Sequence, residues 1–245
     1  MLYITGDTHG DWISRLNTDA FPEQKEMTKD DYVLILGDFG IWDHSKREKY
    51  NLDWLEKKPF TTLFISGNHD NYDILDSLPV SEWHGGKVNF IRPSVIHLMR
   101  GEVYSIEGKT FFAFGGASSH DIRDGILEKD DPRVKQWSCD YSKMFRINHM
   151  SWWERELPSE EEMQNGINNL DKYDWKVDYI ITHSPPASVV VLLGQGLYEQ
   201  DRLTKYLEQI RTGTDYRLMF NGHMHINRLI NEKDILLYEQ IIRLL

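Results

Sequence analysis

Short runs of apolar residues recur along the chain, and each one leads into a loop that holds Asp, Asn or His. In a typical case, the five aliphatic or aromatic residues YVLIL at 32–36 precede Gly37 and Asp38. A run of this length is too short for most helices, and its Val, Leu and Ile content favours a buried strand. Five such strands are predicted, at residues 1–5, 32–36, 61–66, 177–182 and 217–220.

Segments with a helical spacing of apolar residues lie between these strands. Pro59 ends the first of them, and Ser159 with Glu162 forms a capping-box pattern at the start of the third. Residues 80–114 predict short strands joined by hairpins, whereas residues 130–146 are polar and predict irregular structure. The predicted helices are residues 41–58, 72–78, 160–170 and 199–211.

The polar residues after the five strands are types that bind metal ions. Because ligands bind at the carboxyl ends of strands in open α/β sheets, we predict that these side chains meet at one edge. Two carboxylates, one amide and four imidazoles suit Mn, Fe, Zn, Co or Ni better than Ca. Seven ligands are about right for two ions, and the Asp38 carboxylate can bridge them. The predicted ligands are Asp7, His9, Asp38, Asn68, His183, His223 and His225.

Each of these motifs taken alone has a purely structural explanation. Asp and Gly are common in turns, and a single His after a strand is more often a packed core residue than a ligand. The same arrangement after five separate strands argues against coincidence. Within Gly67-Asn68-His69-Asp70, Asn68 offers a carbonyl oxygen, His69 can donate a proton, and Asp70 can hold the His69 ring in one tautomer.

Composition narrows the possible partners. The 245 residues carry a net charge of −11, which argues against a broad basic surface for long nucleic acid but permits a small anionic substrate at a locally positive site. Two divalent cations would outweigh Asp7 and Asp38 and attract phosphate. Cys139 is the single cysteine, and the first residues lack a signal-peptide pattern, so a cytoplasmic location is expected. No apolar run reaches the roughly 20 residues that span a membrane.

The series GDTHGD, GDFG, GNHD, THSPP and GHMH resembles the calcineurin-like metallophosphoesterase superfamily, and FFAFGGASSHD and SWWERELPSEEE resemble a bacterial branch of it. The resemblance runs from Asp7 to His225, nearly the whole chain. It implies an α/β fold of four layers, in which two mixed β-sheets pack face to face with helices on both outer faces. We therefore expect residues 1–245 to form a single domain.

The resemblance also implies how the ligands divide. Asp7, His9, Asp38 and His225 would hold one ion, and Asp38, Asn68, His183 and His223 the other. The cofactors expected are two divalent metal ions, with manganese, iron or zinc as the first candidates.

The predicted activity is that of a dinuclear phosphoric ester hydrolase. A hydroxide that bridges the two ions would attack phosphorus in line. The ions and Asn68 would take up the charge that develops on the phosphoryl oxygens. His69, helped by Asp70, would donate a proton to the departing alkoxide.

The chain departs from the protein phosphatases of this superfamily, which have GDxVDRG and RGNHE. Here the stretches are GDFGIWD and SGNHD, so both phosphate-binding arginines are missing. Arg123 or Arg146 could reach in from the rim, within residues 117–156, which we expect to form an insertion that shapes the substrate cleft. Two alternatives stay open: a phosphodiesterase or nuclease of the same superfamily, and a non-catalytic scaffold on the same fold.

Overall fold

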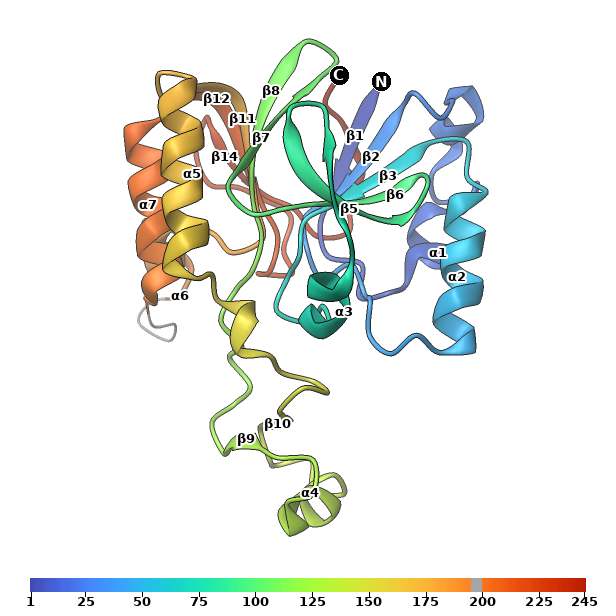
Figure 1. The fold of residues 1–245 in the computed structure, drawn as a ribbon, viewed down its shortest axis with the longest axis vertical. Coiled ribbons are helices and arrows are strands. Elements are labelled where there is room, and N and C mark those ends of the chain that lie inside the picture. The colour runs from blue at the N-terminus through green and yellow to red at the C-terminus, as the bar shows by residue number, and fades with distance from the viewer. Residues whose placement is uncertain (195–199) are drawn as a thin grey trace.

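A computed structural model describes residues 1–194 and 200–245. Two β-sheets face each other, and helices cover the outer face of each (Figure 1). The N- and C-terminal strands, β1 (Leu2–Thr5) and β15 (Ile242–Arg243), pair antiparallel at one edge of the first sheet.

Among the described residues, the first sheet has seven strands in the order β15-β1-β2-β3-β6-β5-β4. Strands β1, β2, β3 and β6 run parallel, so their carboxyl ends lie at one edge. Leu2 pairs with Tyr32, and Tyr32 with Thr61, so the first three strands begin and end level with one another. The further bounds are β2 (Tyr32–Ile35), β3 (Thr61–Phe64), β4 (Val80–Trp83), β5 (Gly86–Arg92) and β6 (Val95–Leu98).

The second sheet has six strands within the same described ranges, in the order β13-β14-β12-β11-β8-β7. Strands β8, β11, β12 and β14 are parallel. Thr182 at the end of β11 pairs with Phe114 on one side and Asn221 on the other, so three strands finish together. The bounds are β7 (Glu102–Ile106), β8 (Lys109–Phe114), β11 (Lys176–Thr182), β12 (Asp215–Asn221), β13 (Arg228–Leu229) and β14 (Asp234–Leu236).

Three apolar clusters separate the layers. The first joins the outer face of the first sheet to its helices and includes Trp12 and Leu55; the second lies between the sheets and includes Leu34 and Ile181. The third joins the second sheet to its helices. The expected four-layer α/β fold is thus confirmed. The helices are α1 (Trp12–Leu16), α2 (Lys46–Glu56), α3 (Tyr72–Ser77), α5 (Glu160–Lys172), α6 (Ala187–Gly194) and α7 (Arg202–Gly213), with short 3-10 turns at Pro22–Glu26 and Glu154–Glu156.

Several elements differ from the predicted ones. Helix α2 begins at Lys46 rather than at residue 41, because the Glu48 carboxylate accepts backbone hydrogen bonds from Trp42, Asp43 and His44 and holds them as a loop. Helix α7 begins at Arg202, capped by Asp201, and residue 199 lies outside the described residues. The short strands β4 and β15 and helix α6 were not predicted.

Residues 117–156 leave the body and return to it as an arm (Figure 1). The arm carries two parallel strands, β9 (Gly125–Leu127) and β10 (Phe145–Ile147), and helix α4 (Pro132–Trp137). The prediction of irregular structure for residues 130–146 was therefore wrong in part: Asp131 caps α4 through the Arg133 amide, and proline is tolerated at its first position. The arm starts after β8, so both its ends lie near the carboxyl edge of the second sheet.

A search of the described residues finds no helix with both the length and the apolar character required to span a membrane.

Candidate metal centre

The loops after β1 and β2 lie against each other at the carboxyl edge of the first sheet. The His9 amide donates to the Asp38 carbonyl at 2.7 Å, and the Gly10 amide donates to the Phe39 carbonyl at 2.9 Å. These backbone bonds bring the Asp-x-His loop and the Gly-Asp loop together before any side chain is considered.

One group of four side chains meets closely. The ligand atoms of Asp7, His9, Asp38 and His225 all lie within 4.8 Å of one another. The two Nε2 atoms of His9 and His225 are 3.0 Å apart, and His225 Nε2 is 3.1 Å from Asp7 Oδ2. This is the set expected to hold the first ion.

His183 lies on the other side of Asp38. Its Nε2 is 3.5 Å from Asp38 Oδ2 and 3.3 Å from Asn68 Oδ1. Its Nδ1 is 2.7 Å from the carbonyl oxygen of Leu36, which can only accept, so Nδ1 carries a proton and Nε2 is the nitrogen that faces Asp38 and Asn68. Asp38 therefore lies between His9 and His183, as a bridging carboxylate would.

Asn68 and His223 are the other two residues predicted to hold the second ion, and both lie near His183. The Asn68 amide group donates to Ser119 Oγ at 3.3 Å, which turns its carbonyl oxygen toward His183. The ring centroid of His223 is 5.0 Å from that of His183, and the His223 backbone amide donates to Asp7 Oδ1 at 3.0 Å.

Several residues of the site have backbone conformations that most amino acids avoid. Four of the predicted ligands have positive φ, a region that Asp and His adopt more readily than most residues and that concentrates at functional sites. They are His9 (47°), Asp38 (43°), His223 (64°) and His225 (49°). Gly37, at φ +91°, leaves room for the ring of His183: a Cβ there would collide with Nδ1.

The charges at the centre suit a cation. Asp7 and Asp38 are each 1 % exposed, and their ion-pair partners within the described residues are histidines, not Lys or Arg. Burial alone would raise the pKa of Asp38, but the surrounding imidazoles, His183 foremost, hold it below its usual range. Burial opposes protonation of His183, yet the Asp38 and Asp7 carboxylates raise its pKa to about 9. Two buried carboxylates with nitrogen and amide-oxygen neighbours fit a borderline divalent metal.

His69 borders this centre. Its ring centroid is 5.2 Å from that of His9, and its backbone amide donates to Asp38 Oδ1 at 2.8 Å. The Arg146 guanidinium lies against the His69 ring, at 3.3 Å from Nε2 and 3.4 Å from Nδ1. Burial lowers the pKa of His69, and Arg146 lowers it further against the opposing effect of Asp38.

The expected role of Asp70 needs correction. Its buried carboxylate accepts backbone hydrogen bonds from Phe39, Gly40 and Gly67 at 2.8–3.2 Å, and the structure describes no hydrogen bond between it and the His69 ring. Burial, then repulsion from Asp38, raises the pKa of Asp70 to about 6. Asp70 joins the loops after β2 and β3; the side chain that contacts His69 is Arg146.

The two rim arginines differ. Arg146 reaches His69 and pairs with Asp121 at 2.5 Å. Arg123 has a side chain that is 68 % exposed, and its contacts in the described chain are Asp124 and the Ser142 carbonyl within the arm.

Sequence reasoning gave no role to His120, Ser119 or Glu156. His120 Nε2 is 3.0 Å from His223 Nε2, and Ser119 links Asn68 to the buried Glu156 carboxylate. For Ser119 and His120 the available signal was their position after β8, which ends at the same edge as β11. The sequence pattern required a potential ligand directly after an apolar run. Strand β8 has none at its end, so the pattern did not find these residues.

Known proteins are similar to this chain. Lariat debranching enzyme A of Xenopus laevis is 29% identical over 142 residues, covering 51% of this chain and 25% of that protein. The lariat debranching enzyme of Caenorhabditis briggsae is 23% identical over 192 residues, covering 70% of this chain and 35% of that protein. The chain thus spans about a quarter to a third of the length of these curated relatives.

Among solved structures, the phosphopantetheinyl hydrolase of Mycobacterium tuberculosis superposes with a TM-score of 0.44 at 16% identity, covering 97% of this chain and 87% of that one. The family described as calcineurin-like phosphoesterase matches residues 2–227. Since the match covers nearly the whole sequence, the chain belongs to the calcineurin-like phosphoesterase family.

Proposed function

We propose that this metallophosphoesterase hydrolyses the phosphate ester of a small substrate with two divalent ions, manganese, iron or zinc being the first candidates. The observation that carries the proposal is the buried Asp38 carboxylate between His9 and His183, at 3.8 and 3.5 Å from their Nε2 atoms. Asp7, His9, Asp38 and His225 would hold one ion, and Asp38, Asn68, His183 and His223 the other. When bound, the ions would supply Lewis acidity and a nucleophile derived from water near neutral pH.

The protein groups around the ions have separate roles in this proposal. Asn68 turns its carbonyl oxygen inward because Ser119 takes its amide hydrogen. His69 donates a proton to the departing oxygen, and Arg146 holds the ring while offering positive charge to the phosphoryl group. The arm of residues 117–156 supplies Arg146, which supports its proposed role in shaping the substrate cleft.

A phosphodiester is the preferred substrate class within this proposal. A terminal phosphate carries about two negative charges and calls for strong positive charge beside the ions. Arg146 is the one arginine against His69 in the described structure, and Asp121 already pairs with it. A diester, with a single negative charge, suits this arrangement better.

The test is a comparison of bis-nitrophenyl phosphate with nitrophenyl phosphate on protein reconstituted with each metal. We expect turnover that depends on added metal and a higher kcat/KM for the diester. Asp38→Asn and His223→Ala should lower metal content, measured by elemental analysis, and abolish turnover, whereas the exposed control Asp19→Asn should change neither. Protein that binds no divalent ion would overturn the metal centre. Protein that binds two ions yet hydrolyses neither ester would favour the scaffold alternative.

A further inference from the structure

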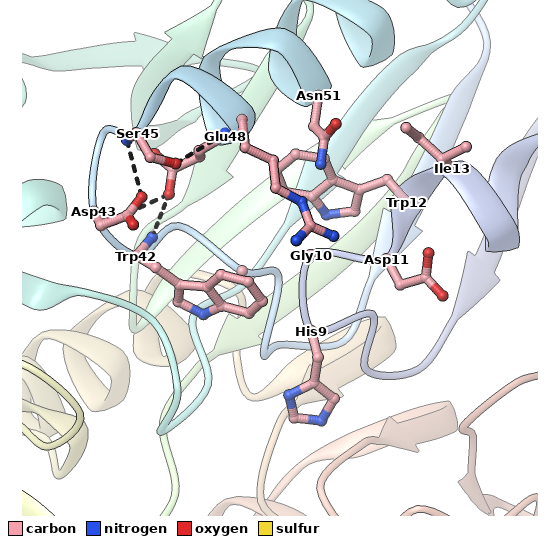
Figure 2. A pocket seen from close by; sticks show the side chains of 12 residues that line it. His9, Gly10, Asp11, Trp12, Ile13, Trp42, Asp43, Ser45, Glu48 and Asn51 are labelled. Atoms are coloured by element: carbon pink, nitrogen blue, oxygen red, sulfur yellow. Dashed lines mark hydrogen bonds between the residues drawn. The ribbon is translucent and has the colours of Figure 1, made fainter.

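A cavity of about 430 Å³ opens beside the metal centre, between the loop after β1 and the start of α2. His9 belongs to both the cavity wall and the metal centre, so a group bound here lies next to the scissile phosphate. The volume falls within the ordinary range for small-molecule sites, roughly 300–1,000 Å³. Figure 2 shows Trp42 and Asn51 along the wall above His9.

Trp42 gives this cavity an aromatic surface. The residue is 44 % exposed, although the residues directly before it in sequence are buried, including Ile41 at 1 %. Its six-membered ring packs against Gly10, where an added Cβ would be 2.8 Å from the ring edge. The remaining ring surface is free to contact a ligand.

The loop that carries Trp42 is fixed from both sides. The backbone amide of Trp42 donates to the buried Glu48 carboxylate at 2.6 Å, and the Trp42 carbonyl accepts from the Asn71 side chain at 2.6 Å. Two residues before Trp42, the Gly40 amide donates to the Asp70 carboxylate. An indole that is exposed and also held in place is preorganised for stacking, because binding then orders few additional groups.

The polar groups of the cavity favour a neutral ring over a second phosphate. Arg47 and Asn51 line it, and neither side chain makes a hydrogen bond or ion pair with any residue that the structure describes. The carboxylates of Asp11 and Asp43 also line it and offset the single guanidinium. The cavity therefore offers donors and acceptors around an aromatic surface without an excess of positive charge.

We propose that this cavity binds the nucleobase of a nucleotide ester, which stacks on Trp42 while its phosphate lies at the metal centre. The inference rests on the proposed phosphoesterase function and adds the substrate class. A nucleobase matches both features of the wall: a planar face for the indole and hydrogen-bonding edges for Arg47 and Asn51. Stacking on an aromatic side chain tolerates any base, so no preference among bases is implied.

The test uses equilibrium binding, which does not depend on turnover. Adenosine 5′-monophosphate and ribose 5-phosphate share a sugar phosphate and differ in the base. On manganese-loaded protein we expect the nucleotide to bind about tenfold more tightly. Trp42→Ala should bring the ratio close to one with metal content and melting temperature retained, and Trp42→Phe should recover most of it. Tyr50→Ala, which removes an aromatic side chain that is 67 % exposed on helix α2 and does not line the cavity, should leave the ratio unchanged.

Two results would overturn the inference. One is equal affinity of the wild type for the two ligands. The other is a preference for the nucleotide that survives in Trp42→Ala. Hydrolysis of methyl nitrophenyl phosphate, measured in parallel on the wild type, reports on the phosphoesterase function separately, so loss of base recognition and loss of the proposed reaction are distinguished.

Discussion

At the scale of single residues, the position and contacts of His69 indicate a role in proton transfer. It lies beside the metal centre without belonging to either proposed ligand set, and Arg146 contacts both of its ring nitrogens. A histidine placed in this way can move a proton without disturbing metal binding.

Replacing His69 with Ala should keep the metal content and lower the rate. General acid catalysis contributes about 10²–10⁴-fold, and its loss matters most when the leaving oxygen is a poor one. We expect a loss of about 100-fold or more with an alkyl ester and a much smaller loss with nitrophenolate as leaving group. Steady-state kinetics on the two substrate types measures the difference. An alkyl ester hydrolysed at the wild-type rate would remove His69 from the mechanism.

Glu156 is a buried acid that makes stability depend on pH. Burial raises its pKa to about 7 from 4.5, although Ser119 donates two hydrogen bonds to it. Between these values the folded chain holds a proton that the unfolded chain has released, so the free energy of unfolding falls as pH rises. This contribution is fully present below pH 4.5 and is lost once the pH has passed 7.

The Glu156→Gln variant tests this dependence because Gln does not ionise. We expect the free energy of unfolding of the wild type, relative to the variant, to fall by about 3 kcal/mol between pH 4.5 and 8. Urea denaturation of both proteins at the two pH values, at the same metal loading, measures the difference. A relative stability that does not change with pH would show that Glu156 titrates normally.

At the scale of elements, the site is built from loops that follow parallel strands, and buried acids hold these loops together. Asp70 joins the loop after β2 to the loop after β3, and Glu48 fixes the chain between β2 and α2. Each acid accepts several backbone hydrogen bonds that the strands and helices leave unsatisfied.

Asp70→Asn should destabilise the fold, because the new amide group points a donor at backbone donors. Leaving buried groups unsatisfied costs about 1–3 kcal/mol, which corresponds to a fall in melting temperature of roughly 2–12 °C for a chain of this size. Differential scanning calorimetry measures the effect. Asp19→Asn, at an exposed position, is the matched control. An unchanged melting temperature would show that these backbone bonds are dispensable.

At the scale of the whole molecule, the outer part of the arm, residues 118–152, lies outside the apolar cores. The three apolar clusters draw on the sheets, the helices and Trp153, and they contain no residue between 118 and 152 of the described chain. The two chain segments of the arm are joined by a backbone hydrogen bond, in which the Asp124 amide donates to the Met144 carbonyl at 2.8 Å.

Shortening the arm should therefore separate folding from substrate binding. Replacing residues 125–143 with two glycines should change the melting temperature by no more than about 3 °C and should keep the metal content. We expect KM for a diester to rise, because Arg146 then loses β9, the strand with which its own strand pairs. Calorimetry and steady-state kinetics give the two readouts. A variant that fails to fold would show that the arm contributes to the core.

The residue types and their order along the chain were enough to predict a set of ligands, because a short apolar run followed by Gly, Asp, Asn or His constrains both backbone and chemistry locally. The same local logic predicted the capping box at Ser159, which the structure contains. The family resemblance and the α/β layers are likewise confirmed by the match over residues 2–227 and by the three cores. The metal-ligand roles themselves stay predictions.

Contacts between distant segments were decided only by the tertiary structure. Arg146 against His69, Asp70 against the Gly40 amide and Trp42 beside His9 each join residues that no spacing rule connects. Periodicity records which face of an element is buried, and it holds no information on which loop meets which. Which loops come into contact depends on the order of the strands in each sheet and on where the arm packs back against the body. Both are set by packing over the whole molecule.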